Sequence, residues 1–151
     1  MKKITLLFAA FCMLCTIYAQ AEMGKWNTHL VYNTTNKVVV TPTKVFALAD
    51  GHVYSMHKQT KEVETYTKVD GWSDNKVADL SYNHQVTTLV CAYTNANIDL
   101  IAVDGTVFNI PDLMQKNWAV DKTIYQIYNE GNLAYLACGF GVLVLDLEKK
   151  E

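Results

Sequence analysis

The sequence predicts an all-β fold, a partial β-propeller of about three blades of four-stranded antiparallel sheet that is incomplete at the C-terminus. Three observations predict it. A strand-turn-strand motif occurs three times, its copies are 45 and 44 residues apart, and β-branched and aromatic residues dominate the segments between the copies. A period of about 45 residues is the length of one propeller blade. A sandwich or small barrel would also suit roughly ten short strands, but it requires no constant period.

The first residues have the features of a secretory signal peptide. Two lysines precede an apolar run of 15 residues, Ile4 to Tyr18, and Ala19-Gln20-Ala21 then supplies the small-x-small pattern of a cleavage site. A membrane-spanning helix needs about 18 apolar residues or more, so we expect cleavage rather than anchoring. No other segment is apolar and long enough, and we expect no transmembrane span in the mature chain. The predicted organisation is a signal peptide, residues 1–21, followed by the N-terminal part of a propeller domain, residues 22–151.

Each repeat is expected to contain a central hairpin, and its turn residues tolerate the positive φ values of tight turns. The hairpins are Phe46–Val53, Cys91–Ile98 and Tyr135–Val142, with turns at Asp50-Gly51, Asn95-Ala96-Asn97 and Gly139-Phe140-Gly141.

Further apolar segments complete the predicted blades. Those expected before the hairpins are Val38–Thr41, Val77–Tyr82 and Thr123–Tyr128, and those expected as outer strands are Val63–Thr67 and Thr106–Ile110. The blades then cover about residues 28–67, 77–110 and 123–151, and residues 111–122 are expected to be a loop with at most one helical turn. No fourth strand follows the last hairpin. An arc of three blades exposes two apolar blade faces, so we expect association, or a chain that is the start of a longer protein.

Charge excludes two classes of partner. Removal of the two signal-peptide lysines leaves 11 of the 13 basic residues against 15 acidic ones, and they are dispersed along the chain. Nucleic-acid binding needs a clustered basic face, and anionic lipid head groups need a basic patch. We therefore expect no nucleic-acid partner and no electrostatic membrane binding.

No residue pattern indicates catalysis, a metal or a cofactor. The four histidines match no ligand spacing and are expected at the surface or at strand ends: His29, His52, His57 and His84. Asp99 and Asp104 flank an apolar strand, where an exposed strand position and a hairpin turn explain them better than a catalytic pair. No polar position recurs from blade to blade, as converging catalytic residues of a propeller enzyme would require. We expect a non-enzyme.

Aromatic residues and cysteines are the remaining candidates for a structural or contact role. Trp26, Trp72 and Trp118 each lie in a polar connecting segment, where they either pack between blades or contact a partner. Cys91 and Cys138 are expected to be small buried side chains in strands. Aligned by the repeat they are three positions apart, so we expect them on opposite faces of neighbouring blades, where an inter-blade disulfide is allowed but not indicated.

Several stretches resemble the N-terminal β-propeller of PorZ-like proteins of the type IX secretion system, and the resemblance covers essentially the whole mature chain. The stretches are Trp26–Asn33, Lys68–Asp74, Ala92–Ile101, Asn109–Asp112 and Leu133–Val142. Lys68–Asp74 is also similar to the repeat of two-component regulator propellers, although Trp72 stands where that repeat has leucine.

The resemblance implies a non-catalytic role in secretion and in the attachment of cargo to the surface of a Gram-negative bacterium. It implies partners in a complex with a sortase-like subunit, contacts with an anionic lipopolysaccharide, and a periplasmic or outer-membrane location. It supplies no catalytic residue. An alternative is the periplasmic ligand-sensing propeller of a hybrid two-component regulator, which predicts a transmembrane helix and a kinase further along the protein.

Overall fold

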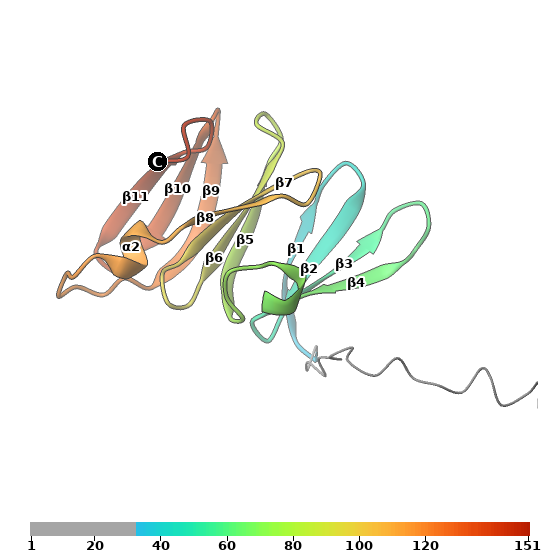
Figure 1. The fold of residues 1–151 in the computed structure, drawn as a ribbon, viewed down its shortest axis with the longest axis horizontal. Helices are drawn as coiled ribbons and strands as arrows, with labels where there is room; N and C mark the ends of the chain where they lie inside the picture. Colours follow the sequence, from blue (N-terminus) through green and yellow to red (C-terminus); the bar gives the residue numbers. More distant parts are fainter. Residues whose placement is uncertain (1–32) are drawn as a thin grey trace, which may run out of the picture.

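The computed structural model describes residues 33–151, which form three antiparallel sheets that lie side by side (Figure 1). Blade 1 contains β1 (Thr35–Val40), β2 (Lys44–Ala49), β3 (His52–His57) and β4 (Val63–Tyr66). Blade 2 contains β5 (Val77–Asn83), β6 (Thr88–Tyr93), β7 (Ile98–Ala102) and β8 (Val107–Ile110). Blade 3 contains β9 (Ile124–Glu130), β10 (Leu133–Cys138) and β11 (Gly141–Asp146). The predicted partial propeller with a three-stranded last blade is confirmed.

Two short helical segments join the blades, and they lie in the connections rather than in the sheets. The 3-10 helix η2 (Lys68–Asp70) leads from blade 1 to blade 2, and α2 (Asp112–Gln115) leads from blade 2 to blade 3. The second is the one helical turn anticipated within residues 111–122. The predicted signal peptide, residues 1–21, lies outside the described residues. Within residues 33–151, no helix has the length and hydropathy needed to cross a membrane.

The blades pack face to face around two apolar clusters, one at each junction. Phe46 of blade 1 packs with Leu80 of blade 2 at the first junction, and Val90 of blade 2 packs with Leu136 of blade 3 at the second. Alternate side chains of a strand point to opposite faces. The strand β6 is apolar along nearly its whole length, and this allows blade 2 to pack against a neighbouring blade on both of its faces. Each large side chain fully buried in this way contributes about 1.5–3 kcal/mol.

The central hairpin of blade 2 has one more loop residue than the hairpins of blades 1 and 3. The equivalent pairs of the three hairpins are Leu48 with Val53, Ala92 with Ile98, and Ala137 with Val142, which enclose four, five and four residues. In blade 1 both turn residues, Asp50 and Gly51, have positive φ (51° and 80°), as a type I′ turn requires. An alignment of the three repeats without a gap therefore places the strand before the turn of blade 2 one position out of register with blades 1 and 3.

The innermost strand of each blade contains an irregularity in its pairing. The shifts fall between Thr35 and Lys37 in β1, between Val77 and Asp79 in β5, and opposite the step from Ala137 to Cys138 in β9. A β-bulge bends a strand and redirects the side chain that follows it. Asp79, redirected in this way, contacts both neighbouring blades.

Polar side chains connect β5 to β9 at alternate residues. Asp79 Oδ2 accepts from the backbone N–H of Ile127 at 2.7 Å, and Asn129 Nδ2 donates to Ser81 Oγ at 2.7 Å. Asn83, which is buried, donates from Nδ2 to the carbonyl of Gly131 at 2.9 Å. Three alternate residues of β5 therefore form hydrogen bonds to blade 3, and these bonds fix the two inner strands in register.

The two outward blade faces carry exposed apolar side chains, as an arc of three blades requires. Blade 1 exposes Val38, Val40, Met56 and Val63, and blade 3 exposes Tyr128, Val142 and Val144. Strand pairing places each set on the side opposite the buried cluster of its own blade. In blade 2 the corresponding two faces are covered by blades 1 and 3.

Candidate functional site

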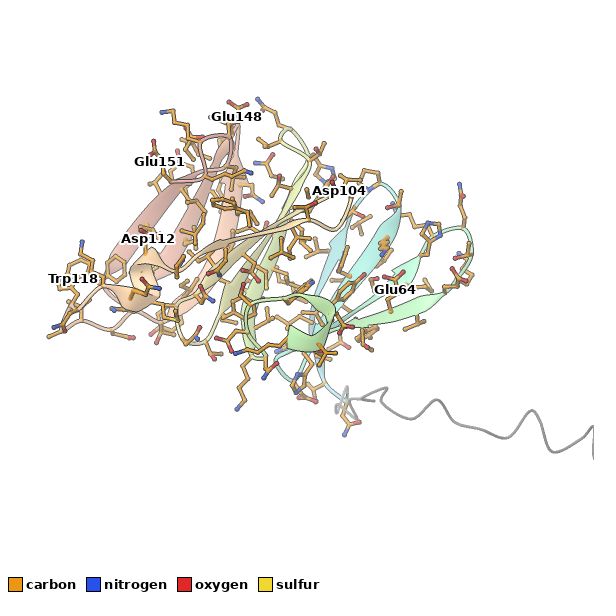
Figure 2. All side chains as sticks on the ribbon, viewed as in Figure 1. Glu64, Asp104, Asp112, Trp118, Glu148 and Glu151 are labelled. Atoms are coloured by element: carbon orange, nitrogen blue, oxygen red, sulfur yellow. The ribbon has the colours of Figure 1, made fainter. Side chains whose placement is uncertain are left out.

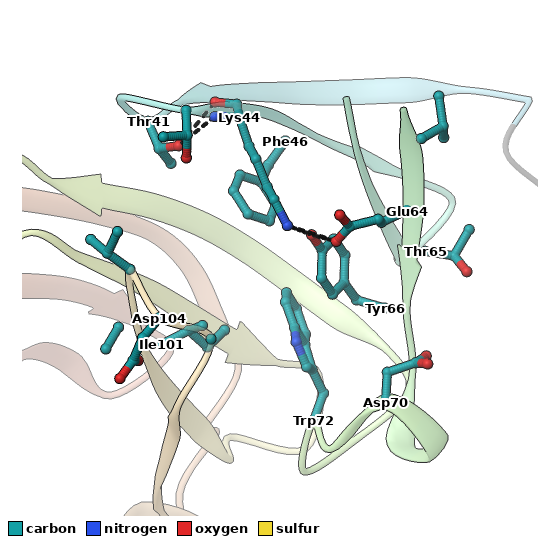
Figure 3. Close-up of a pocket in the computed structure, with 15 residues that line it drawn as sticks. Thr41, Lys44, Phe46, Glu64, Thr65, Tyr66, Asp70, Trp72, Ile101 and Asp104 are labelled. Carbon is teal, nitrogen blue, oxygen red and sulfur yellow. Dashed lines mark hydrogen bonds and ion pairs between the residues drawn. The ribbon is translucent and has the colours of Figure 1, made fainter. Parts of the chain in front are cut away.

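A groove of about 660 Å³ lies at the junction of blades 1 and 2 (Figure 3). One wall is formed by β2 and β4 of blade 1, with the segment after η2. The other wall is formed by the end of β7 and the turn that leads to β8, residues 101–105. The groove is therefore lined by residues of two repeats.

Three aromatic rings in contact form the blade 1 side of the groove. The Tyr66 ring lies 5.4 Å from the Phe46 ring and 5.0 Å from the Trp72 ring, between centroids, and is nearly parallel to the indole. Phe46 and Trp72 are buried, and Tyr66 is half-buried. Aromatic pairs of this kind contribute about 0.5–1.5 kcal/mol beyond their burial, so these contacts stabilise the wall.

A polar network crosses the aromatic wall. Lys44 Nζ lies 2.6 Å from Glu64 Oε2 and donates to Tyr66 Oη at 3.1 Å. Tyr66 Oη in turn donates to Glu64 Oε2 at 3.0 Å, and Ser55 Oγ lies 2.8 Å from Tyr66 Oη. Ser55 is buried, whereas Lys44 and Glu64 reach solvent at the groove. Figure 3 shows Lys44 directed at Glu64 across the face of the aromatic wall.

The network determines the charge states of Lys44, Glu64 and Tyr66 at neutral pH. The hydrogen bond from Lys44 holds the pKa of Glu64 below its ordinary value, despite some burial. Burial opposes the charged form of Lys44, but its bonds to Glu64 and Tyr66 outweigh that effect and raise the Lys44 pKa. Burial raises the pKa of Tyr66. The groove therefore presents an ammonium, a carboxylate and a neutral phenol. Because the side chains of Lys44 and Glu64 are both partly exposed to solvent, their pair contributes less than about 1 kcal/mol to stability.

The predicted tryptophans differ in environment. Trp72 lies in the buried cluster between blades 1 and 2. Trp118 is 45 % exposed on the connection between blades 2 and 3, where its ring contacts Phe140 at 5.0 Å (Figure 2). It lines a second, more apolar groove of about 540 Å³ between α2 and β11. Trp26 lies outside the described residues.

The two cysteines are free thiols at different junctions. Cys91 lies in the cluster between blades 1 and 2, and Cys138 in the cluster between blades 2 and 3. The longer hairpin of blade 2 makes Cys91 equivalent to Leu136 rather than to Tyr135. When blades 2 and 3 are aligned by their strand pairing, the two cysteines are two positions apart, so they lie on the same face of their respective blades. The expectation of opposite faces was wrong. A disulfide between them is not formed.

Both thiols are expected to resist alkylation in the folded chain. Burial and the nearby charge of Asp99 raise the pKa of Cys91 well above its ordinary value, and burial raises the pKa of Cys138. The thiolate is the reactive form, and both side chains are also shielded. Peptide mapping after iodoacetamide treatment at pH 8 should find both unmodified, and fully modified in denaturant. Labelling of either residue at the denatured rate would contradict the buried placement.

Asp99 is completely buried, so its expected exposed position was wrong. Its Oδ2 accepts from the backbone N–H of Ser73 at 2.8 Å and from the Tyr93 hydroxyl at 2.5 Å, and its Oδ1 accepts from Asn109 Nδ2 at 2.8 Å. Three neutral donors satisfy the carboxylate, which ties the connection after η2 to blade 2. Asp104 lies in the β7–β8 turn, as expected for a turn residue, and accepts from the backbone N–H of Thr106.

The histidines in the described part of the chain are separate from one another in role. His57 Nδ1 accepts from the Thr60 backbone N–H, and the His84 ring packs edge-on against Tyr82. His52 begins β3 beside the type I′ turn. His29 lies outside the described residues. Among residues 33–151, no three His, Cys, Asp or Glu side chains are grouped so as to hold a metal ion.

Comparison with known proteins identifies the class of this chain. Residues 45–151 match the model of the N-terminal β-propeller domain of PorZ from the type IX secretion system. The chain belongs to this family, as its sequence predicts. It is 41 % identical to the solved structure of PorZ, a surface component of the type IX secretion system of Porphyromonas gingivalis, with a TM-score of 0.78 over 84 % of the chain. It spans 17 % of the length of that protein. The search of curated proteins found no match.

Two extracellular domains of B. thetaiotaomicron hybrid two-component systems share the fold. One is 7 % identical with a TM-score of 0.64 over 78 % of the chain, and the other is 14 % identical with a TM-score of 0.61 over 89 % of it. The chain corresponds to 16 % and 19 % of those structures. At these identities the likeness shows a common propeller architecture alone.

Proposed function

We propose that the chain acts as a non-catalytic part of a type IX secretion component at the envelope of a Gram-negative bacterium. The observation that carries the proposal is the 41 % identity to PorZ maintained across 84 % of the chain. The two-component sensors share the blades at much lower identity, which makes sensing the weaker alternative.

The proposed mechanism is attachment of secreted cargo by non-covalent contacts. The chain contributes a propeller surface that holds other subunits of the complex, a sortase-like subunit among them, and the assembly brings cargo to an anionic lipopolysaccharide. The family membership supports this role.

Disruption of the gene in its own bacterium tests the proposal. We expect cargo to accumulate in the periplasm and to disappear from the cell surface, and an intact copy of the gene should restore both. A disruptant with normal cargo on its surface would contradict the proposal. A disruptant that instead changes transcription in response to an added glycan would favour the sensor alternative.

A further inference from the structure

The polar network of the first groove is absent from the corresponding positions of blade 2. Strand pairing makes Lys44 equivalent to Thr88, Ser55 to Leu100, Glu64 to Phe108 and Tyr66 to Ile110. Leu100 and Ile110 belong to the apolar cluster between blades 2 and 3. Blade 2 therefore packs against its neighbour without such a network, and blade stacking does not explain why blade 1 carries one.

The groove has more negative than positive side chains. Its lining contains one cation, Lys44, and three carboxylates, those of Glu64, Asp70 and Asp104. Lys44 is already paired with Glu64. The hydrogen bond from the Thr106 backbone lowers the pKa of Asp104, so this exposed carboxylate is ionised at neutral pH. The groove thus disfavours an anionic ligand and attracts a cationic one.

The two walls differ in a way that suits a side chain with an apolar stem and a charged head. The half-buried Tyr66 ring, backed by the buried Trp72, supplies apolar surface on the blade 1 side, while Asp104 lies at the rim of the blade 2 side, across the groove (Figure 3). Arginine packs its methylene stem along apolar surface and directs a planar guanidinium to carboxylates. Lysine offers a single charged point and matches this arrangement less well.

We propose that the groove between blades 1 and 2 binds an arginine side chain of an extended polypeptide segment. The stem lies along the Tyr66 ring, and the guanidinium donates to Asp104. The inference goes beyond attachment of cargo to lipopolysaccharide, because it assigns to this groove a basic peptide partner rather than an anionic glycan.

Titration with the peptide acetyl-Gly-Ser-Arg-Ser-Gly-amide tests the inference, with the indole N–H signal of Trp72 in a ¹H–¹⁵N NMR spectrum as the readout. A Trp72→Phe variant assigns the signal. We expect a saturable shift, and we expect a peptide with citrulline in place of arginine to bind about tenfold more weakly, since a charge-assisted hydrogen bond is lost. Equal binding of the two peptides would overturn the inference.

Two variants locate the binding. D104N retains the turn, because an asparagine oxygen still accepts from the Thr106 backbone, and it should weaken binding of the arginine peptide by about 2- to 5-fold. The matched control, E148Q, removes the same charge from an exposed residue of blade 3 and should leave the affinity unchanged. An unchanged affinity in D104N, or an equal loss in both variants, would overturn the assignment to this groove.

Discussion

Replacement of Trp72 by alanine is expected to lower the free energy of unfolding by about 3–5 kcal/mol. The indole is 5 % exposed, stacks on Tyr66 of blade 1, and packs in the same cluster as Leu80 and Ile101 of blade 2. Its removal leaves a cavity at the junction where two four-stranded sheets meet. The loss combines the transfer free energy of the indole with the cost of that cavity.

Trp118 provides a control with the same chemistry. It is 45 % exposed and contacts Phe140 and the ammonium of Lys116 at the surface. Trp118→Ala is therefore expected to change the free energy of unfolding by less than about 1 kcal/mol. Urea unfolding followed by far-ultraviolet circular dichroism measures both values. Equal destabilisation by the two substitutions would show that Trp72 is not the more important residue at a blade junction.

The sequence does not distinguish these two tryptophans, because both lie in polar connections shortly before the first strand of a blade. The difference arises from residues distant in the chain. Trp72 is covered by Tyr66 of β4, the fourth strand of the preceding blade. The equivalent residue of blade 2 is Ile110 of β8, which offers no aromatic ring, and Trp118 contacts Phe140 instead. A local pattern reports the residue type but not the neighbour that covers it.

The fold was predictable because the repeat is periodic and most of the strands are rich in apolar residues. Hairpin turns such as Asp50-Gly51 have a strong local preference for positive φ, so their positions were evident from the sequence. The register was less predictable. One added loop residue in blade 2 reverses the faces of the strand before the turn, and the relation between Cys91 and Cys138 was misjudged for that reason.

The candidate site was not predictable, because its parts are brought together by pairing and stacking. Lys44 and Glu64 are 20 residues apart and meet only because β2 and β4 flank β3. Asp99 was assigned to an exposed position because charged residues are usually exposed. Its burial depends on Ser73, Tyr93 and Asn109, which satisfy the carboxylate from three separate segments.

Replacement of Asp79 by alanine is expected to lower the free energy of unfolding by about 3 kcal/mol, because this carboxylate joins all three blades. Asp79 is 5 % exposed. Lys37 of blade 1 donates to both its oxygens at 2.6 and 2.7 Å, and the backbone N–H of Ile127 in blade 3 donates at 2.7 Å. Truncation leaves a buried N–H and an ammonium without their acceptor. Loss of one partner from a buried pair costs about 3–5 kcal/mol, and partial exposure of Lys37 places the value at the lower end.

A double-mutant cycle separates the contribution of the ion pair from that of the blade 3 hydrogen bond. We expect K37M and D79A to show a coupling energy of about 1–2 kcal/mol, since each removes the same contact. K68M is the matched control, because Lys68 pairs with Asp74 at the surface at 3.2 Å and its loss should cost less than about 1 kcal/mol. If D79A remains strongly destabilising in the K37M background, the hydrogen bond to Ile127 accounts for the remainder. If instead D79A alone costs no more than K68M, then the bulge in β5 does not join the three blades through this carboxylate, and their stacking rests on the two apolar clusters.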